Sequence, residues 1–198
     1  DWYLAIAARG YAADGSTVYF PLYPFLIRVA GVFIGDPMLA ALLISNLALI
    51  GVLALLHEQA KALFGSSSAR RTVAYLLVFP TGFFLLAAYT ESLFLLLTLG
   101  AFAFAQRGRW YVAAICGTLA ALTRLQGVLL ILPLAYMWWR AARLEFQVTS
   151  HRSQVSRFTF HVLRSLVLLL IPLATIAFLA FTNLSLLITY EGQLHAQF

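Results

Sequence analysis

Six long apolar stretches follow one another along this chain, and most of the basic residues lie in the polar segments between them. About 20 apolar residues are enough for a helix to cross the hydrocarbon core of a membrane. Hydrophobic residues make up 63% of the sequence and charged residues only 10%, which is far from the composition of soluble globular proteins. The sequence therefore predicts an all-α integral membrane protein, a multi-span helical bundle with about six spans and additional interfacial helices.

The basic residues are distributed asymmetrically. Ten of the thirteen fall into three clusters, which are Lys61, Arg70 and Arg71; Arg107 and Arg109; and Arg140, Arg143, Arg152, Arg157 and Arg164. Basic residues next to spans favour the cytoplasmic side, so the clusters predict one cytoplasmic face. The opposite face would hold Asp1, Arg9, Asp14, Arg28, Asp36, Glu91, Arg124, Glu191 and His195. We expect the chemistry of the protein on that second face.

The charge also bears on partners. A sequence pI near 9.8 is compatible with nucleic-acid binding, but the basic residues flank apolar segments and form no continuous stripe. Anionic membrane lipids are the simpler partner, and no nucleic acid is expected. Cys116 lies in an apolar segment and has no second cysteine to pair with, and the histidines show no metal-ligand spacing. We therefore expect no disulfide framework and no zinc site at these residues, and no cofactor is predicted.

The predicted spans are residues 38–56, two crossings within 72–106, two within 110–139, and 165–187. At about 1.5 Å per residue, 72–106 would form roughly 52 Å of helix, which is too long for one crossing. We predict that Thr90 caps the second of these helices and that Glu91 lies in its first turn. Arg124 marks the next turn, and Pro80 and Pro172 predict kinks.

The chain is predicted to form a single membrane domain over residues 1–198, as a fragment of a longer polypeptide. Residues 1–37 would be a non-cytoplasmic interfacial loop with short helices, whose aromatic residues Trp2, Tyr3, Tyr11 and Tyr19 would form a headgroup belt. Residues 38–187 would form the transmembrane bundle. Polar loops are expected at 65–71 and 144–160, and residues 188–198 would begin a second non-cytoplasmic loop.

The ionisable residues of the second face indicate a reaction type. Charged groups at a membrane edge are costly, and their default interpretation is functional. Arginines can neutralise a lipid-linked phosphate, and a carboxylate can accept the proton of a substrate hydroxyl. These needs match group transfer from a lipid phosphate donor. Two simpler interpretations stay open at this point. Glu91 can be a carboxylate in the first turn of a helix, where the helix dipole stabilises it, and Arg124 can be a side chain that extends to the lipid headgroups.

Short motifs along the chain carry a family resemblance. They are Trp2 to Tyr11 (WYxxIAxxGY), Phe20 to Pro24 (FPLYP), Phe79 to Thr81 (FPT), Tyr89 to Phe94 (YxESLF) and Ala121 to Arg124 (ALTR), with His195 to Gln197 as a weaker HAQ-type echo. In these motifs and their order, the chain resembles the PIG-V type mannosyltransferases, which are related to GPI mannosyltransferases. The resemblance extends from residue 1 to about residue 140.

This resemblance implies a GT-C glycosyltransferase architecture and a dolichyl or polyprenyl phosphate mannose donor. A loop aspartate would deprotonate or orient the acceptor hydroxyl, and arginines would stabilise the departing phosphate. In that family the loop usually opens with Trp-Asp, two further residues and Trp-Tyr, so its catalytic aspartate would lie about three positions before Trp2, upstream of this sequence. Asp1 is adjacent to Trp2 and is the catalytic candidate within this chain. The resemblance implies no metal. The resemblance further implies substrate-binding roles for Arg9, Tyr23, Tyr89, Glu91, Arg124 and His195.

Alternatives from other classes also stay open. A multi-span transporter or lipid flippase would line a path with ionisable residues, although such proteins commonly show paired broken helices near the midplane. A structural membrane subunit would leave the ordered motifs unexplained. The acceptor could be a glycolipid, a protein or another glycan. A bacterial plasma membrane is the expected location rather than the endoplasmic reticulum membrane.

Overall fold

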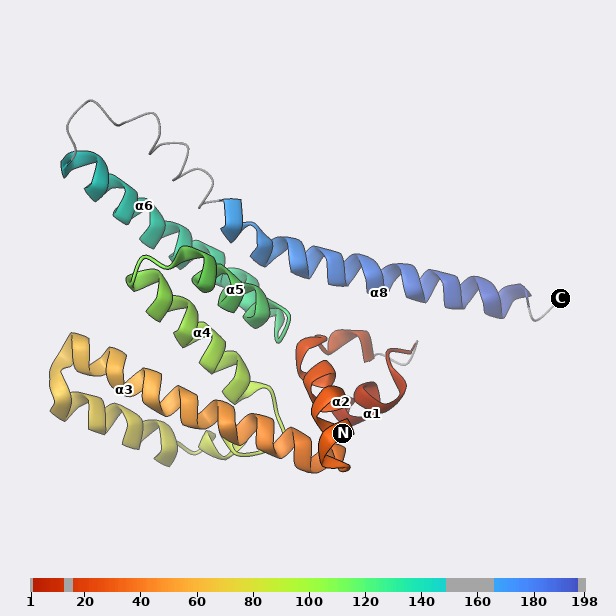
Figure 1. Cartoon of the computed structure of the whole chain (residues 1–198). Coiled ribbons are helices and arrows are strands. Elements are labelled where there is room, and N and C mark those ends of the chain that lie inside the picture. The colour runs from red at the N-terminus through yellow and green to blue at the C-terminus, as the bar shows by residue number, and fades with distance from the viewer. Residues whose placement is uncertain (1, 13–15, 149–165, 196–198) are drawn as a thin grey trace.

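The computed structural model describes residues 2–12, 16–148 and 166–195, and these residues form helices and no strand. The elements are α1 (Trp2–Arg9), η1 (Ser16–Val18), α2 (Leu22–Ile34), α3 (Pro37–Val78), η2 (Gly82–Leu85), α4 (Glu91–Gln106), α5 (Trp110–Ala121), η3 (Leu125–Leu130), α6 (Ile131–Val148) and α8 (Leu170–His195), as Figure 1 shows. The prediction of an all-α fold is confirmed for this part of the chain.

Within the described ranges, three helical stretches are long and apolar enough to cross a membrane: Pro37–Val78, Leu125–Arg143 and Leu166–Asn183. Each exposes large apolar side chains, for example Leu47, Leu132 and Ile176, which is compatible with contact to lipid. The apolar helices Leu22–Ile34, Glu91–Gln106 and Trp110–Ala121 are shorter than a typical span. The structure thus supports three of the predicted spans by length and composition.

Helix α3 consists of two arms, residues 37–64 and 66–78, that lie side by side in opposite directions (Figure 1). The reversal occurs at Gly65, whose φ of 83° is readily adopted only by glycine. The prediction of a polar linker over 65–71 was wrong, because one glycine is enough to reverse the chain and the helix resumes directly after it.

The second arm of α3 ends at Val78. Phe79 is extended, with φ −61° and ψ 137°, because the following Pro80 disfavours helical backbone at the residue before it. Pro80 therefore ends a helix instead of kinking one, and the predicted crossing over this segment is not a continuous helix. The irregular segment that follows is satisfied from neighbouring elements: Asn46 donates to the Leu86 carbonyl at 3.1 Å, and Ser92 donates to the Leu85 carbonyl at 2.6 Å.

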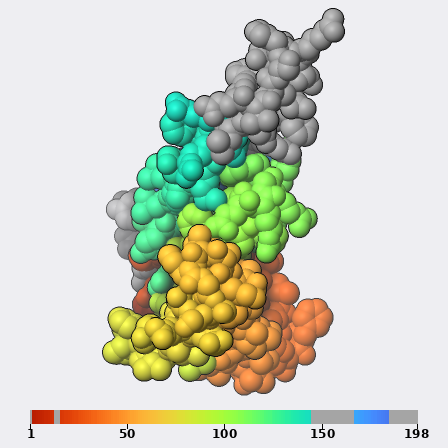
Figure 2. Space-filling model, turned by 90° about the vertical axis from the view of Figure 1, so that its left-hand side faces the viewer, coloured from red at the N-terminus to blue at the C-terminus, as the bar shows by residue number. Residues whose placement is uncertain are grey.

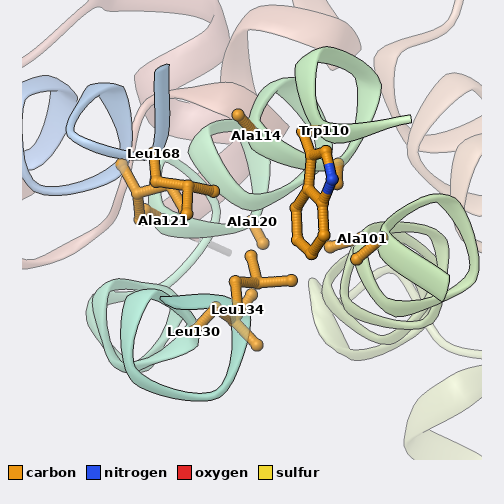
Figure 3. Close-up of a cluster of buried hydrophobic side chains, with 11 residues drawn as sticks. Ala101, Trp110, Ala114, Ala120, Ala121, Leu130, Leu134 and Leu168 are labelled. Atoms are coloured by element: carbon orange, nitrogen blue, oxygen red, sulfur yellow. The ribbon is translucent and has the colours of Figure 1, made fainter. Parts of the chain in front are cut away.

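Helices α4 and α5 form a hairpin that packs against α6 and the start of the last helical stretch. Their shared core contains Trp110 of α5, which faces Ala101 of α4, with Leu130 and Leu134 nearby (Figure 3). Small residues allow close approach: a Cβ at Gly117 would lie 2.7 Å from Cδ1 of Ile171. The predicted break at Arg124 is confirmed, since α5 ends at Ala121 and Arg124 is extended.

Two boundaries near the carboxyl end differ from the prediction. Helix α6 continues to Val148, so the first residues of the predicted loop 144–160 are helical and the rest lies outside the described ranges. Helix α8 continues to His195, so residues 188–195 are helical where a loop was predicted. The helical stretch 166–195 is interrupted at Leu169, and Pro172 lies in the first turn of the helix that resumes there, so the predicted break at Pro172 is confirmed.

The arrangement of the helices separates the described charges. The Gly65 bend of α3 and the carboxyl ends of α4 and α6, which carry the basic clusters, lie towards the left in Figure 1, whereas α1 and α2 lie on the other side. Figure 2 views the molecule from that left-hand side, with the arms of α3 at the front and α4 and α6 above them. The amino-terminal helices therefore lie away from the basic ends of α3, α4 and α6.

Candidate functional site

An ion pair joins the start of α4 to the end of α5. Nη2 of Arg124 donates to Oε1 of Glu91 at 2.7 Å, although 33 residues separate the two in sequence. The side chains keep 35% and 26% of their exposure, respectively. Glu91 is the first residue of α4, and Arg124 is held in extended backbone between α5 and η3. The two residues, which the charge distribution places on one face, are therefore in direct contact.

Backbone and side-chain contacts fix the two turns against the amino-terminal segment. The Leu22 N–H donates to the Leu122 carbonyl at 3.0 Å and so ties the start of α2 to the residue two before Arg124. Ser45 of α3 donates to the Tyr89 carbonyl at 2.9 Å, two residues before Glu91. The segments that resemble the FPLYP, YxESLF and ALTR motifs therefore adjoin one another in space.

A cavity of about 550 Å³ opens beside Arg124. Its polar lining consists of Tyr3, Thr17, Tyr19, Thr123, Arg124, Gln126, Thr182 and Asn183, and its apolar lining of Val18, Phe20, Leu125 and Leu179. These residues come from α1, the segment around η1, the α5 to η3 turn and α8. Thr123, Thr182 and Asn183 donate to nearby backbone carbonyls, so what they offer a ligand's hydroxyl groups is mainly acceptor oxygens. Arg124 adds an anion-binding group.

A second cavity, of about 490 Å³, adjoins the first. Its lining is mainly apolar and consists of Leu125, Gln126, Val128, Leu129, Pro172, Thr175 and Ile176. Leu125 and Gln126 line both cavities. A charged, hydroxyl-rich compartment and an apolar one therefore share a wall between η3 and α8.

Tyr3, Tyr19 and Tyr23 form a cluster of rings that extends from the cavity wall to the buried core. Tyr3 packs edge-on against both Tyr19 and Tyr23, with ring centroids 5.1 Å and 5.2 Å apart. Burial raises the pKa of Tyr3, the hydroxyl of Thr90 and the charge of Arg124 act to lower it, and the charge of Glu91 acts to raise it. The Tyr3 hydroxyl therefore stays protonated at neutral pH, on the cavity wall.

The remaining predicted site residues lie elsewhere. Tyr23 is fully buried and is absent from the cavity wall. Tyr89 is 43% exposed and packs edge-on against Phe84. Arg9 is exposed at the end of α1 and lines neither cavity. Asp1 lies outside the described residues, and so does the side chain of His195, whose backbone ends α8.

Several cavity residues were not singled out from the sequence. Tyr3 and Tyr19 were assigned to a headgroup belt, because aromatic residues near a membrane interface usually belong there. Thr182 and Asn183 are two polar residues in an otherwise apolar stretch. That pattern is the one signal that could have indicated them, since polar residues within a span usually face the interior of a bundle.

Among the residues that the structure describes, no group of three or more His, Cys, Asp or Glu side chains could hold a metal ion. Comparisons of the chain with known protein families, characterised proteins and solved structures find no match. The site is therefore interpreted from its own geometry and from the motif resemblance alone.

Proposed function

We propose that this chain belongs to a membrane glycosyltransferase of GT-C type. It would transfer a sugar, mannose by the motif resemblance, from a polyprenyl or dolichyl phosphate donor to a hydroxyl of a lipid-linked or glycan acceptor, on the non-cytoplasmic face of a multi-span bundle. The observation that carries the proposal is Arg124, a guanidinium oriented by Glu91 at the wall of a cavity lined by hydroxyl, amide and aromatic groups.

Arg124 is suited to bind the donor phosphate. A guanidinium has five N–H donors, and the Glu91 contact uses one nitrogen, so donors remain for a ligand in the cavity. A carboxylate that holds the guanidinium in one orientation preorganises it before the phosphate departs. In this proposal Glu91 is a positioning residue and Arg124 contacts the substrate.

The reaction itself is a displacement at the sugar's anomeric carbon. The bond from that carbon to the phosphate oxygen breaks, and the lipid phosphate leaves with the electron pair. The acceptor oxygen forms the new bond from the opposite face, and its proton passes to a carboxylate base. Asp1 is the candidate for that base within this chain. Arg124 would offset the negative charge that develops on the leaving phosphate.

The two adjoining cavities support a lipid-linked donor. A polyprenyl phosphate sugar has a hydroxyl-rich head, an anionic phosphate and an apolar chain. The first cavity offers polar groups and a cation, and the second offers an apolar wall that shares Leu125 and Gln126 with it. A soluble sugar nucleotide would have no use for the apolar compartment.

The test is a transfer assay on the purified full-length protein in lipid vesicles. Radiolabelled polyprenyl phosphate mannose is supplied with a membrane extract as acceptor, and transfer into the extract is measured. We expect Arg124→Gln to lower the rate by about 100-fold, as for loss of one stabilising donor in other enzymes. Glu91→Gln should also lower it.

Exchanging the charges of Glu91 and Arg124 separates phosphate binding by Arg124 from the structural role of the ion pair. The double variant with Glu91→Arg and Arg124→Glu keeps an ion pair but moves the guanidinium off the cavity wall, so it should fold and remain inactive. Normal transfer by this variant would contradict the role of Arg124. Solute counterflow by the wild-type protein without sugar transfer would instead favour a transporter.

A further inference from the structure

A buried chain of hydrogen bonds joins three elements next to the ion pair. The Tyr23 hydroxyl of α2 lies 2.7 Å from the Ser45 hydroxyl of α3, and the Ser45 hydroxyl donates to the Tyr89 carbonyl at 2.9 Å. Both side chains are 0% exposed. Tyr89 lies in the segment that leads into α4. The chain therefore links the interfacial helix α2 to the residues just before Glu91.

The number of hydroxyl protons on Tyr23 and Ser45 determines which group donates in each of these hydrogen bonds. A serine hydroxyl has one proton, and Ser45 gives it to Tyr89. The 2.7 Å contact therefore has Tyr23 as donor, and the Ala41 carbonyl, 3.1 Å from the Tyr23 hydroxyl, is a second acceptor for the same proton. Ser45 is the middle member: it accepts from one element and donates to another.

The start of α4 has no side-chain cap to fix it. Thr90, the residue before Glu91, has helical backbone angles (φ −83°, ψ −9°) and forms no side-chain cap hydrogen bond, so the predicted capping role of Thr90 was wrong. Side-chain caps normally come from residues in the extended region. The Tyr89 carbonyl, two residues before Glu91, is held by the Ser45 hydroxyl of α3.

We propose that Ser45 is a positioning residue, which sets the place of Glu91 and, through the 2.7 Å ion pair, the orientation of Arg124 at the cavity. The effect of Ser45 on the transfer rate rests on the proposed glycosyl transfer. Its effect on the order of residues 86–92 does not, because that effect can be measured without any reaction.

The first measurement uses hydrogen exchange of the protein in lipid nanodiscs. In Ser45→Ala the Tyr89 carbonyl loses its partner, and the amides of residues 86–92 should exchange about tenfold faster, as expected for the loss of one hydrogen bond. The middle of α4 should be unchanged. Gln59→Met is the matched control, because Gln59 donates to the Leu99 carbonyl at 3.0 Å and also ties α3 to α4, but away from the site.

The second measurement is the transfer rate in two backgrounds. Ser45→Ala should lower kcat/KM about tenfold in the wild-type background and by less than about twofold in Glu91→Gln, because the two residues act through one pair. Gln59→Met should keep the wild-type rate. If Ser45→Ala fails to fold, Tyr23→Phe tests the same series of hydrogen bonds. It leaves the Ser45 to Tyr89 bond in place, so its effects should be in the same direction and smaller.

The outcomes separate the two proposals. Unchanged exchange at residues 86–92 in Ser45→Ala, or an equal rate loss in both backgrounds, would overturn the positioning role. A wild-type protein that transfers no sugar would overturn the proposed function, while the exchange measurement would still decide whether Ser45 fixes this segment.

Discussion

At the scale of single residues, the ion pair of Glu91 and Arg124 adds little to stability. The side chains of Arg124 and Glu91 keep 35% and 26% of their exposure, respectively. Ion pairs of exposed side chains contribute only about 0.2–1 kcal/mol. Oε2 of Glu91 is buried and has no hydrogen-bond partner among the described residues, which is a further cost. A pair chosen only for stability would satisfy both carboxylate oxygens.

Tyr23 gives a pH-dependent prediction at the same scale. Burial raises the pKa of Tyr23 from 10.0 to about 12, although the Ser45 hydrogen bond lowers it somewhat. Folding therefore favours the protonated phenol, and this contribution is fully present below pH 10 and is lost as the pH rises from 10 towards 12. The measurement is the free energy of unfolding of the wild-type protein and of Tyr23→Phe between pH 8 and about pH 12.

The wild-type protein should lose more stability than Tyr23→Phe over that interval, because the variant has no phenol to ionise at this position. Tyr3 and Tyr11 also have raised pKa values, and they are present in both proteins. Their contributions therefore cancel in the difference. Parallel pH profiles for the two proteins would show that the Tyr23 phenol is not protected by the fold.

Some site residues could be predicted from the sequence and others could not. Glu91 and Arg124 stand alone in apolar surroundings, so their cost in a membrane made them visible. Ser45 lies within an apolar run, where a serine usually returns its proton to its own helix and carries no signal. Its partner is 44 residues away, at Tyr89. Contacts of that kind depend on the packing of α3 against the irregular segment, which no local pattern records.

At the scale of elements, the close packing of η3 against the end of α5 depends on Gly127. A Cβ on Gly127 would lie 2.5 Å from the carbonyl oxygen of Ala120, and backbone atoms cannot move aside as a flexible side chain can. Gly127→Ala should therefore lower the free energy of unfolding by about 1–3 kcal/mol, as overpacking does. It should also displace Arg124, which lies three residues earlier and accepts from the Gly127 N–H at 2.9 Å through its carbonyl.

Gly100→Ala is the matched control for that substitution. A Cβ there would meet only Sγ of Cys116 at 3.5 Å, which is ordinary van der Waals contact. Alanine also has the higher helix propensity, so this variant should be neutral or slightly more stable. Chemical unfolding of both variants in detergent is the measurement. Equal stability of the two variants would mean that η3 can shift without cost.

Helix boundaries can be read from the sequence where a residue acts locally, but not where the backbone groups of a segment bond to residues far along the chain. Gly35 ends α2 with a left-handed φ of 82°, and Asp36 caps α3 by accepting from the Met38 N–H at 2.8 Å. Those signals are readable. The irregular residues between Val78 and Glu91 are not, because their backbone groups bond to Asn46, Ser45 and Ser92. An apolar composition alone predicted a continuous helix there.

At the scale of the whole molecule, the distribution of charge predicts which end of each helix faces which side of the membrane, and this can be tested. Helix α4 runs from Glu91 to Gln106, and α5 returns from Trp110 to Ala121. The hairpin therefore places Arg107 and Arg109 at one end and the Glu91 to Arg124 pair at the other. Sixteen residues of α4 cover roughly 24 Å at about 1.5 Å per residue, less than the ~30 Å of a hydrocarbon core. The flanking charged residues would have to reach the interfaces for this hairpin to cross.

Cysteine labelling tests that crossing. Cys116 is the one cysteine of the chain, so Cys116→Ala gives a cysteine-free background into which Arg107→Cys or Gln126→Cys is introduced. Both positions are exposed in the structure. In right-side-out vesicles, a membrane-impermeant maleimide should label Gln126→Cys and leave Arg107→Cys unlabelled, and inside-out vesicles should reverse the result, because the basic end is expected in the cytoplasm. Labelling of both positions from the same side would mean that the hairpin does not cross, and the cavity beside Arg124 would then not face the side on which sugar transfer is proposed.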